Sequence, residues 1–434
     1  MPPPAALITP TTILPAGPAE GGRTVSRWWD VVISGAGPAG SRAAELFAAR
    51  GARVLFLDPR APWEKPCGGG LTAAALRNTP ELYEVTATGA AVREILAMAP
   101  CGASVVVPLR QPFAVVSRRT LSEWGLERAQ KAGALFRRAG IESALELSDG
   151  WEVTDTAGKV HRARWLIAAD GAASRLRRQL APRLRPELAP TRVGYPTKGV
   201  PCGRAVFYFL PVAEGYVWDF PRPDHHSVGI GVAPGTYRRD ALDGALQQYQ
   251  AAETGISGAV LRHGAAIATA KWASGRFADL AGFRFALLGD AAGLANPLTG
   301  EGIDYALRSA KLAVETFDDA LGFSLYPDAV RRAFKREIAR ALLIRRWLYR
   351  PGVADRLIVG ARRSPRAALL LMALADAINE HGSLRSAVLR ALSGDAPDQE
   401  ATRAACDCPD GRNGCAPSSE AGKESGSDQL TLQR

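Results

Sequence analysis

The chain has 434 residues, 47% of them hydrophobic and 22% charged, which is typical of a globular protein with one large core or two smaller ones. Its formal net charge of +11 comes mostly from arginine. This charge fits anionic partners or a general arginine bias, and we expect no nucleic-acid partner. No run of roughly 18 apolar residues occurs, so no membrane-spanning helix is expected.

Residues 1–26 are rich in Pro, Ala, Thr and Gly, and we expect a disordered extension there. They lack a basic start followed by an apolar run, so no secretory signal is predicted. The six cysteines are spaced too irregularly for a disulfide framework and fit a reducing compartment. A cytoplasmic protein is the resulting expectation.

The first structured unit is predicted to be strand, helix, strand. An apolar run over 31–33 stops at Gly35, a helix is expected over 38–50, and a second buried strand is expected over 53–57. Gly51 is the predicted helix stop. The helix presents a small inner face to the strands, made of Ala39, Gly40, Ala43 and Ala44.

The middle of the chain is predicted to be rich in strands. Residues 151–154 and 160–169 flank a turn and indicate a hairpin. Between 199 and 234, strands at 205–210, 216–220 and 227–232 alternate with turns and indicate an antiparallel sheet. One more buried strand is expected over 283–288, and a helix is expected to begin near Gly302.

Beyond Pro327 the pattern becomes helical and basic, and a second apolar stretch covers 367–378. This region is either an ordinary helical domain with a solvated basic face or a surface that rests on an anionic leaflet. The polar tail at 394–434 is predicted to be disordered. Its cysteines are interpreted as surface thiols rather than a zinc site: Cys406, Cys408 and Cys415.

The first chemical motif is a G-x-G-x-x-G at Gly35, Gly37 and Gly40, between the predicted strand and helix. Gly35 permits a tight turn, Gly37 lets a pyrophosphate approach the backbone, and Gly40 lets helix and strand pack closely. The helix start offers N–H groups to the phosphates. Asp58, at the end of the second strand, can accept ribose hydroxyls. Together they predict a dinucleotide site.

The second motif combines Leu287-Leu288-Gly289-Asp290 with the later turn Pro297-Leu298-Thr299-Gly300-Glu301-Gly302. A strand that runs into Gly-Asp can place the Asp290 carboxylate beside a polyol such as a ribityl chain. The turn opens a helix whose N–H groups can stabilise negative charge on a reduced flavin ring.

These motifs, with Ala169-Asp170-Gly171-Ala172-Ala173-Ser174 between them, resemble the group A flavoprotein hydroxylase superfamily. Within it, Lys65-Pro66-Cys67-Gly68-Gly69-Gly70 and a Y-x-W-x-F-P stretch from Tyr216 to Pro221 resemble the geranylgeranyl reductase family. The likeness covers residues 28–318. Ala169 departs from the pattern, because the superfamily usually has Gly there, but Asp170 and Gly171 are intact.

The resemblance implies an α/β fold, with a Rossmann-type FAD-binding domain, an inserted antiparallel β-sheet substrate domain and a C-terminal helical region. We expect the FAD-binding domain at 27–84, 114–186 and 276–325. The substrate domain is expected at 85–113 and 187–275, and the helical region at 326–393.

The resemblance also implies FAD as the cofactor, held in part by an arginine at a helix start. Arg118 best matches that arginine, and Arg119 is the alternative if the register slips by one. The expected FAD contacts are Gly35, Gly37, Pro38, Ala39, Gly40, Asp58, Cys67, Gly68, Gly69, Arg118, Asp170, Gly171, Asp290, Pro297, Gly300, Gly302 and Ile303.

Cys67 is the candidate catalytic residue. A thiol beside a flavin can assist proton delivery or order the substrate, and Lys65 can lower its pKa; the alternative is a small buried hydrophobe.

Tyr216, Trp218 and Phe220 alternate on one strand and so face one side. Strand aromatics are usually core, but the resemblance implies that these line the substrate cavity as an apolar wall for an isoprenoid chain. The adjacent histidines at 225 and 226 lack ligand spacing, so no metal site is expected.

The implied activity is FAD-dependent reduction of carbon–carbon double bonds in an isoprenoid lipid, which needs a positioned proton source as well as hydride. NAD(P)H or an acidic reduced ferredoxin is the expected electron donor, and peripheral contact with the inner membrane is a further expectation. The alternatives are a monooxygenase or flavin-dependent halogenase of the same superfamily and a flavin-bearing binding protein without turnover. Tyr216, and Pro66-Cys67-Gly68 after Lys65, favour the reductase over a halogenase.

Overall fold

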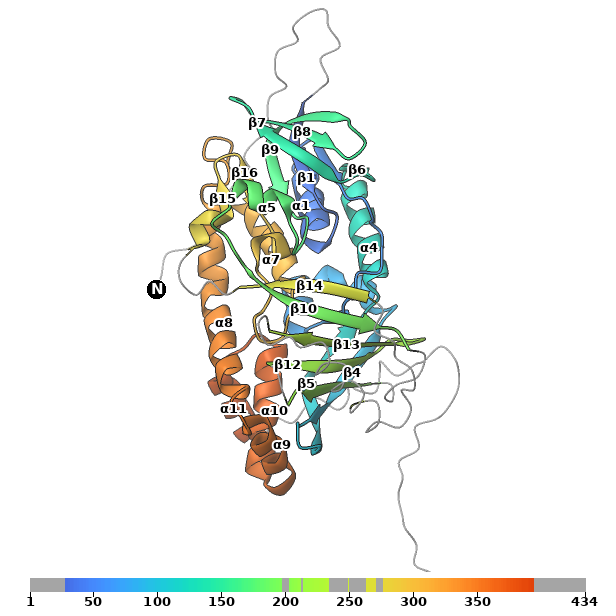
Figure 1. Cartoon of the computed structure of the whole chain (residues 1–434), viewed down its shortest axis with the longest axis vertical. Helices are drawn as coiled ribbons and strands as arrows, with labels where there is room; N and C mark the ends of the chain where they lie inside the picture. The colour runs from blue at the N-terminus through green and yellow to red at the C-terminus, as the bar shows by residue number, and fades with distance from the viewer. Residues whose placement is uncertain are drawn as a thin grey trace, which may run out of the picture. The chain divides into compact units, whose positions relative to one another are not determined.

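The computed structural model describes residues 28–196, 203–211, 214–233, 249, 263–270 and 276–393 (Figure 1). The predicted extension at 1–26 and the predicted tail at 394–434, with its three cysteines, lie outside the described residues. The main helices are α1 (Pro38–Ala49), α2 (Ala73–Asn78), α3 (Tyr83–Thr86), α4 (Arg118–Lys131), α5 (Arg175–Leu180), α7 (Ile303–Glu315), α8 (Tyr326–Leu348), α9 (Val353–Arg363), α10 (Pro365–Asn379) and α11 (Leu384–Leu392).

The first sheet is built on the predicted strand–helix–strand unit. Its strand order is β15-β16-β9-β1-β2-β6, and β8 and β7 extend it from β9. The strands β1, β2, β6, β9 and β16 pair with their neighbours in parallel. The apolar runs of β1, of β2 and of the end of β9 are buried on both faces. Its strands are β1 (Trp29–Ser34), β2 (Val54–Leu57), β6 (Leu135–Arg137), β7 (Ile141–Glu146), β8 (Trp151–Asp155), β9 (Val160–Ala168), β15 (Ala281–Gly282) and β16 (Phe285–Leu287).

Two predictions fall on this sheet. The hairpin predicted over 151–154 and 160–169 is confirmed, because β8 and β9 pair antiparallel before β9 continues beside β1. The strand predicted over 283–288 is shorter than expected, because Gly282 and Phe285 pair across a tight turn and leave only Phe285–Leu287 to join β9.

The second sheet has the order β14-β10-β13-β12-β11-β4-β5-β3. The predicted strands at 205–210, 216–220 and 227–232 are confirmed as the antiparallel neighbours β11, β12 and β13. Its strands are β3 (Gly70–Leu71), β4 (Ala90–Met98), β5 (Ser104–Val115), β10 (Glu187–Gly194), β11 (Arg204–Phe209), β12 (Gly215–Pro221), β13 (His226–Val232) and β14 (His263–Thr269).

The second sheet also differs from the sequence-based picture in its strand pairing. The long β4–β5 hairpin was not predicted, and β4 pairs with β11 in parallel. β3 belongs to the segment 27–84, expected in the FAD-binding domain, yet it pairs with β5. β5 runs to Val115, past the expected boundary at 113. The loop that carries Cys67 therefore enters the second sheet directly.

The predicted helical region at 326–393 contains α8, α9, α10 and α11. α9 and α10 pack against β5, and α10 also packs against α11. In Figure 1 these helices lie beside the second sheet. No helix in the described part of the chain is both long and apolar enough to cross a bilayer.

The glycine turn between β1 and α1 explains why helix and sheet approach so closely. A Cβ on Gly35 would lie 2.2 Å from the Ala169 carbonyl oxygen, and a Cβ on Gly40 would lie 1.9 Å from the Gly35 oxygen. A Cβ on Gly37 would meet no atom within 4 Å. Gly35 and Gly40 are thus required by packing, whereas Gly37 faces open space.

This difference predicts unequal effects of the two substitutions on stability. We expect Gly40→Ala to lower the free energy of unfolding by about 1–3 kcal/mol, because backbone must move to admit the methyl group. Gly37→Ala, the matched control, should leave stability nearly unchanged. Chemical denaturation of the two variants tests this, and equal losses in both would contradict the packing explanation.

Candidate active site

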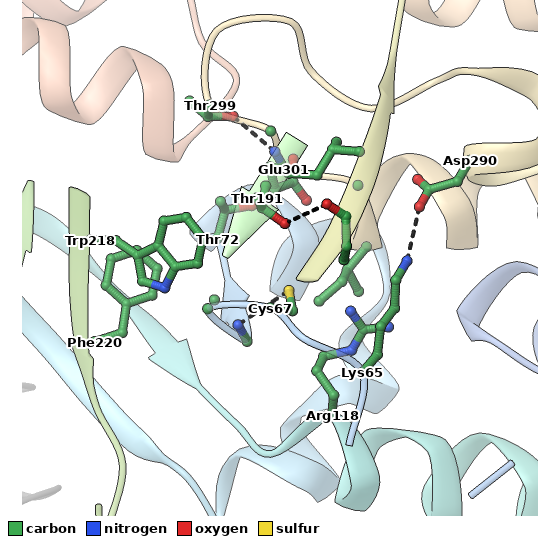
Figure 2. A pocket seen from close by; sticks show the side chains of 18 of the residues that line it. Lys65, Cys67, Thr72, Arg118, Thr191, Trp218, Phe220, Asp290, Thr299 and Glu301 are labelled. Carbon is green, nitrogen blue, oxygen red and sulfur yellow. Dashed lines mark hydrogen bonds and ion pairs between the residues drawn. The ribbon is translucent and has the colours of Figure 1, made fainter. Parts of the chain in front are cut away.

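A cavity of about 760 Å³ runs from the start of α1 to the C-terminal helices. One end is lined by the glycine turn, Asp58 and Asp170, and the other by apolar side chains of β4, β11, α9 and α10. Figure 2 shows its centre, with Cys67 between the Trp218 and Phe220 rings on one side and Arg118 and Lys65 on the other.

The end near α1 has the features of a phosphate site. α1 begins without a side-chain cap and without an acidic residue in its first turn, so its N–H groups are available to an anion. Gly37 leaves open space beside them. The Asp58 carboxylate lines the cavity, and one of its oxygens accepts a hydrogen bond from the Ala36 N–H at 3.0 Å.

A second helix start faces the cavity. α7 begins after Gly302, which has no side chain to cap it, and the Glu301 carboxylate accepts from the Asp304 N–H at 3.0 Å. Gly300, Gly302 and Ile303 line the cavity there. Asp290 lies beside this helix start, and its carboxylate pairs with the Lys65 ammonium at 3.0 Å (Figure 2). The sequence predicted a single carboxylate, Asp290, at this position, and the structure shows it paired with Lys65.

The two arginines considered at the start of α4 differ in burial. The Arg118 residue is 8% exposed and lines the cavity, and its Nε has no hydrogen-bond partner among the described residues. The Arg119 side chain is 66% exposed and pairs with Glu123 at 3.0 Å. Ser117 caps the helix, because its Oγ accepts from the Arg119 and Thr120 N–H groups. Neighbouring residues of a helix with 3.6 residues per turn point in different directions.

The Cys67 loop is held by the β12–β13 hairpin. The Cys67 carbonyl oxygen accepts from the Ser227 hydroxyl at 3.0 Å and from the Arg222 guanidinium at 3.4 Å. The Gly69 N–H lies 3.4 Å from the Cys67 sulfur. These contacts fix the thiol in the cavity wall, and neither Ser227 nor Arg222 was singled out from the sequence.

The charge around Cys67 favours its thiolate. Burial raises the pKa of Cys67, but Arg118, the Gly69 N–H and Lys65 together lower it below its ordinary value. Arg118 has the largest lowering effect, and Lys65, the neighbour considered from the sequence, a smaller one. The thiol therefore gives up its proton more readily than a free cysteine.

The aromatic residues of β12 both support the Cys67 loop and line the cavity. Tyr216, Trp218 and Phe220 all line the cavity. A Cβ on Gly68 would lie 2.8 Å from the Phe220 ring, and the Trp218 indole N–H donates to Ser227 at 3.4 Å. The Tyr216 hydroxyl donates to the Thr299 carbonyl, which joins the aromatic strand to the turn before α7.

The structure separates the remaining expected contacts into two groups. Residues that line the cavity are Pro38, Ala39, Gly68, Gly69, Asp170 and Gly171, with those described above. Gly35, Gly40 and Pro297 do not line it, and the two glycines act through packing. Asp170 accepts from Ser174 and from the Arg175 N–H, and burial raises its pKa.

The histidines of the chain's titratable clusters pair with carboxylates of the protein itself. His226 pairs with Asp219 at 2.8 Å and His225 with Asp224 at 2.6 Å. Glu301, Asp304 and His381 place ligand-type atoms within 4.8 Å of one another. The Asp304 carboxylate is already engaged by Asn78 and Arg308. His381 comes from the C-terminal helices, and no local sequence pattern linked it to the site.

An uncapped helix start that opens onto an apolar chamber is the arrangement of a flavoprotein oxidoreductase, and the protein belongs to that class. No protein-family model matches the chain. The chain is 30% identical over 319 residues to digeranylgeranylglycerophospholipid reductase 1 of Methanopyrus kandleri, covering 68% of this chain and 81% of that protein. It is 31% identical to the menaquinone reductase of Mycobacterium tuberculosis (strain ATCC 25618 / H37Rv), covering 73% and 83%. The chain is therefore a member of the geranylgeranyl reductase family.

Solved structures share the fold. A geranylgeranyl bacteriochlorophyll reductase-like protein from Thermoplasma acidophilum has a TM-score of 0.59 at 21% identity, over 85% of this chain and 97% of that one. The halogenase PltM in complex with phloroglucinol and FAD has a TM-score of 0.57 at 19% identity, over 83% and 85%. The predicted fold class is thus confirmed.

The geometry around Cys67 predicts how its reactivity depends on pH. We expect Arg118→Met to raise the pKa of Cys67, because burial is then opposed by less positive charge. Alkylation by iodoacetamide should shift to higher pH, measured by mass spectrometry of the Cys67 peptide. Arg119→Met, the matched control, should leave the profile unchanged, and an equal shift in both variants would refute this assignment.

Proposed function

We propose that the protein is an FAD-dependent reductase of carbon–carbon double bonds in the isoprenoid chain of a lipid. The observation that carries this proposal is the continuity of the cavity. It joins the phosphate-type helix start to Cys67 and continues as an apolar chamber whose wall includes Ile95, Val107, Phe209, Ile358, Leu371 and Leu374. A chain of apolar units without polar groups fits such a chamber.

The chain's own residues fit FAD. The open space at Gly37 and the uncapped start of α1 suit a pyrophosphate. Asp58 suits the ribose, Asp290 suits the ribityl chain, and the free Arg118 Nε faces the same cavity. The start of α7 offers N–H groups to a flavin ring. These residues, with the Cys67 loop, would hold the cofactor.

Reduced FAD, when bound, supplies a hydride. An isolated alkene has no carbonyl to take up the resulting charge, so the second carbon must receive a proton from a positioned donor. In this step the Cys67 thiol would donate the proton on its sulfur, and the lowered pKa eases that release. Ser227 and Arg222 hold the Cys67 loop, and the Trp218 and Phe220 rings pack beside Gly68. Apolar rings in this position would exclude water from the thiol.

The proposed electron donor follows from the positive net charge of the chain. The chain contains one G-x-G-x-x-G motif and a net charge of +11. NAD(P)H or an acidic reduced ferredoxin, both anionic, would be attracted to such a surface. Stopped-flow reduction of the flavin by each donor distinguishes them.

The C-terminal helices are proposed to rest on the anionic cytoplasmic leaflet of the inner membrane. Leu343 on α8 is 68% exposed, Trp347 43% exposed, and Leu370 on α10 53% exposed. Arg346 and Arg350 flank Trp347 and are also exposed. Because α9 and α10 line the apolar end of the cavity, a lipid tail would have a short path from the leaflet to the site.

Turnover of a lipid tests the proposed function. The purified protein, reduced with dithionite without oxygen, should add two hydrogens to each reduced bond of a geranylgeranyl lipid, detected by mass spectrometry. Cys67→Ala should bind FAD but turn over about 10²–10⁴-fold more slowly, because the positioned proton is lost. Cys101→Ala removes an exposed thiol and is the matched control.

Three outcomes would contradict this function. A wild-type protein that binds no flavin overturns it, and so does a flavin that stays reduced when the lipid is added. Hydroxylated or halogenated product under air would instead identify a monooxygenase or a halogenase.

Vesicle binding tests the membrane proposal. The double variant Arg346→Glu and Arg350→Glu should lose binding to anionic vesicles in a flotation assay, while neutral vesicles bind neither protein strongly. Arg175→Glu with Arg185→Glu makes the same change in net charge at exposed positions on or after α5. Equal losses in both double variants would show a nonspecific charge effect and contradict the assigned surface.

A further inference from the structure

A buried ionic cluster lies where the C-terminal helices meet the start of α7. His381, in the turn between α10 and α11, places Nε2 3.0 Å from a Glu301 oxygen and Nδ1 3.3 Å from an Asp304 oxygen. The three side chains are 7%, 9% and 0% exposed, respectively. Glu301 and His381 also line the cavity, so the cluster belongs to the wall that the proposed flavin would face.

Charged and polar groups reach this cluster from several elements. Arg308 of α7 pairs with Asp304 at 3.1 Å and with Glu337 of α8 at 2.9 Å, and Glu337 lies 3.9 Å from His381 Nδ1. Asn78 of α2 donates to Asp304 at 3.1 Å. The other close contacts are the Tyr305 ring, whose centroid is 5.5 Å from that of His381, and the Arg340 guanidinium on the His381 carbonyl.

Arg308 alone does not balance the carboxylates. Glu301, Asp304 and Glu337 carry three negative charges against one guanidinium, so the imidazole is the second cation available to them. Burial lowers the pKa of His381, but Glu301 and Asp304 outweigh it and raise the pKa to about 10. The imidazole is therefore protonated at neutral pH.

The backbone at His381 is unusual. Its φ is 51°, and among the described residues no other non-glycine residue has a positive φ. Residues with a side chain rarely adopt this region of backbone conformation. Such a conformation persists only where surrounding contacts fix it. Here the ion pairs of the ring with α7 and the bonds of Arg340 to the carbonyls of His381 and Gly382 do so.

We propose that His381 is a positioning residue for the flavin: its imidazolium holds Glu301 and Asp304 at the start of α7 and offsets their charge. The inference rests on the proposed function. Two uncompensated carboxylates at a helix start would cancel the partial positive charge that favours a negatively charged reduced ring. The C-terminal helices thus supply a cation that makes the flavin easier to reduce.

The midpoint potential of the bound flavin tests this inference. His381→Asn removes the cation, and asparagine tolerates a positive φ, so the variant should fold and bind FAD but show a more negative potential. Adding Glu301→Gln to it should move the potential back toward that of the wild type. His161→Asn alters a buried histidine paired with Asp155 at 2.9 Å in the first sheet, and this control should keep the wild-type potential.

The flavin-free protein gives an independent readout. Because the pKa of His381 is raised in the folded state, its ion pairs stabilise the fold fully below pH 6.5, and this stabilisation is lost as the pH rises toward about 10. In denaturation measured across this range, His381→Asn should lose less stability than the wild type. Identical pH dependence in the two proteins would overturn the cluster's ionic role.

The outcomes separate the two proposals. A wild-type protein without flavin overturns the proposed function and this inference with it. A wild-type protein that binds flavin, together with an unchanged potential in His381→Asn, overturns the inference alone.

Discussion

The contact on which the site depends is the one between the glycine loop carrying Cys67 and the β12–β13 hairpin. Gly68 leaves no room for a side chain because the Phe220 ring occupies that space, and Ser227 holds the Cys67 carbonyl. The loop begins near the nucleotide-type sheet and ends as β3 of the second sheet. One short segment thereby fixes the thiol relative to both sheets.

Fixed charges then divide the cavity into a polar half and an apolar half. Arg118 and Lys65 stand at the polar half, where they lower the pKa of the Cys67 thiol. The Asp290 carboxylate that pairs with Lys65 lies beside the start of α7. The apolar half is closed by α9 and α10. The His381 cluster sits at the junction, where the turn after α10 meets the start of α7.

Local pattern was sufficient to predict the elements that carry the nucleotide-type site. The glycine turn, the small inner face of α1 and the continuous apolar strands follow from short-range rules, and the structure has them where expected. The β4–β5 hairpin was not predicted, because only part of its pattern alternates and its pairing with β11 is parallel. The choice between Arg118 and Arg119 also stayed open, since neighbouring residues at a helix start point in different directions and the sequence does not say which direction faces the cavity.

The sequence by itself determined the class of fold, the glycine turn of the nucleotide-type site and the candidate thiol. Each is recognised from motifs whose residues lie close together along the chain. Only the tertiary structure decided what surrounds that thiol. Ser227 and Arg222, which hold the Cys67 loop, come from the β12–β13 hairpin, and Glu301 and His381 reach the same cavity from two other distant segments. Nothing in their local patterns links these three segments. Charge compensation and burial are properties of groups packed together in space, so they exist only once the chain has folded.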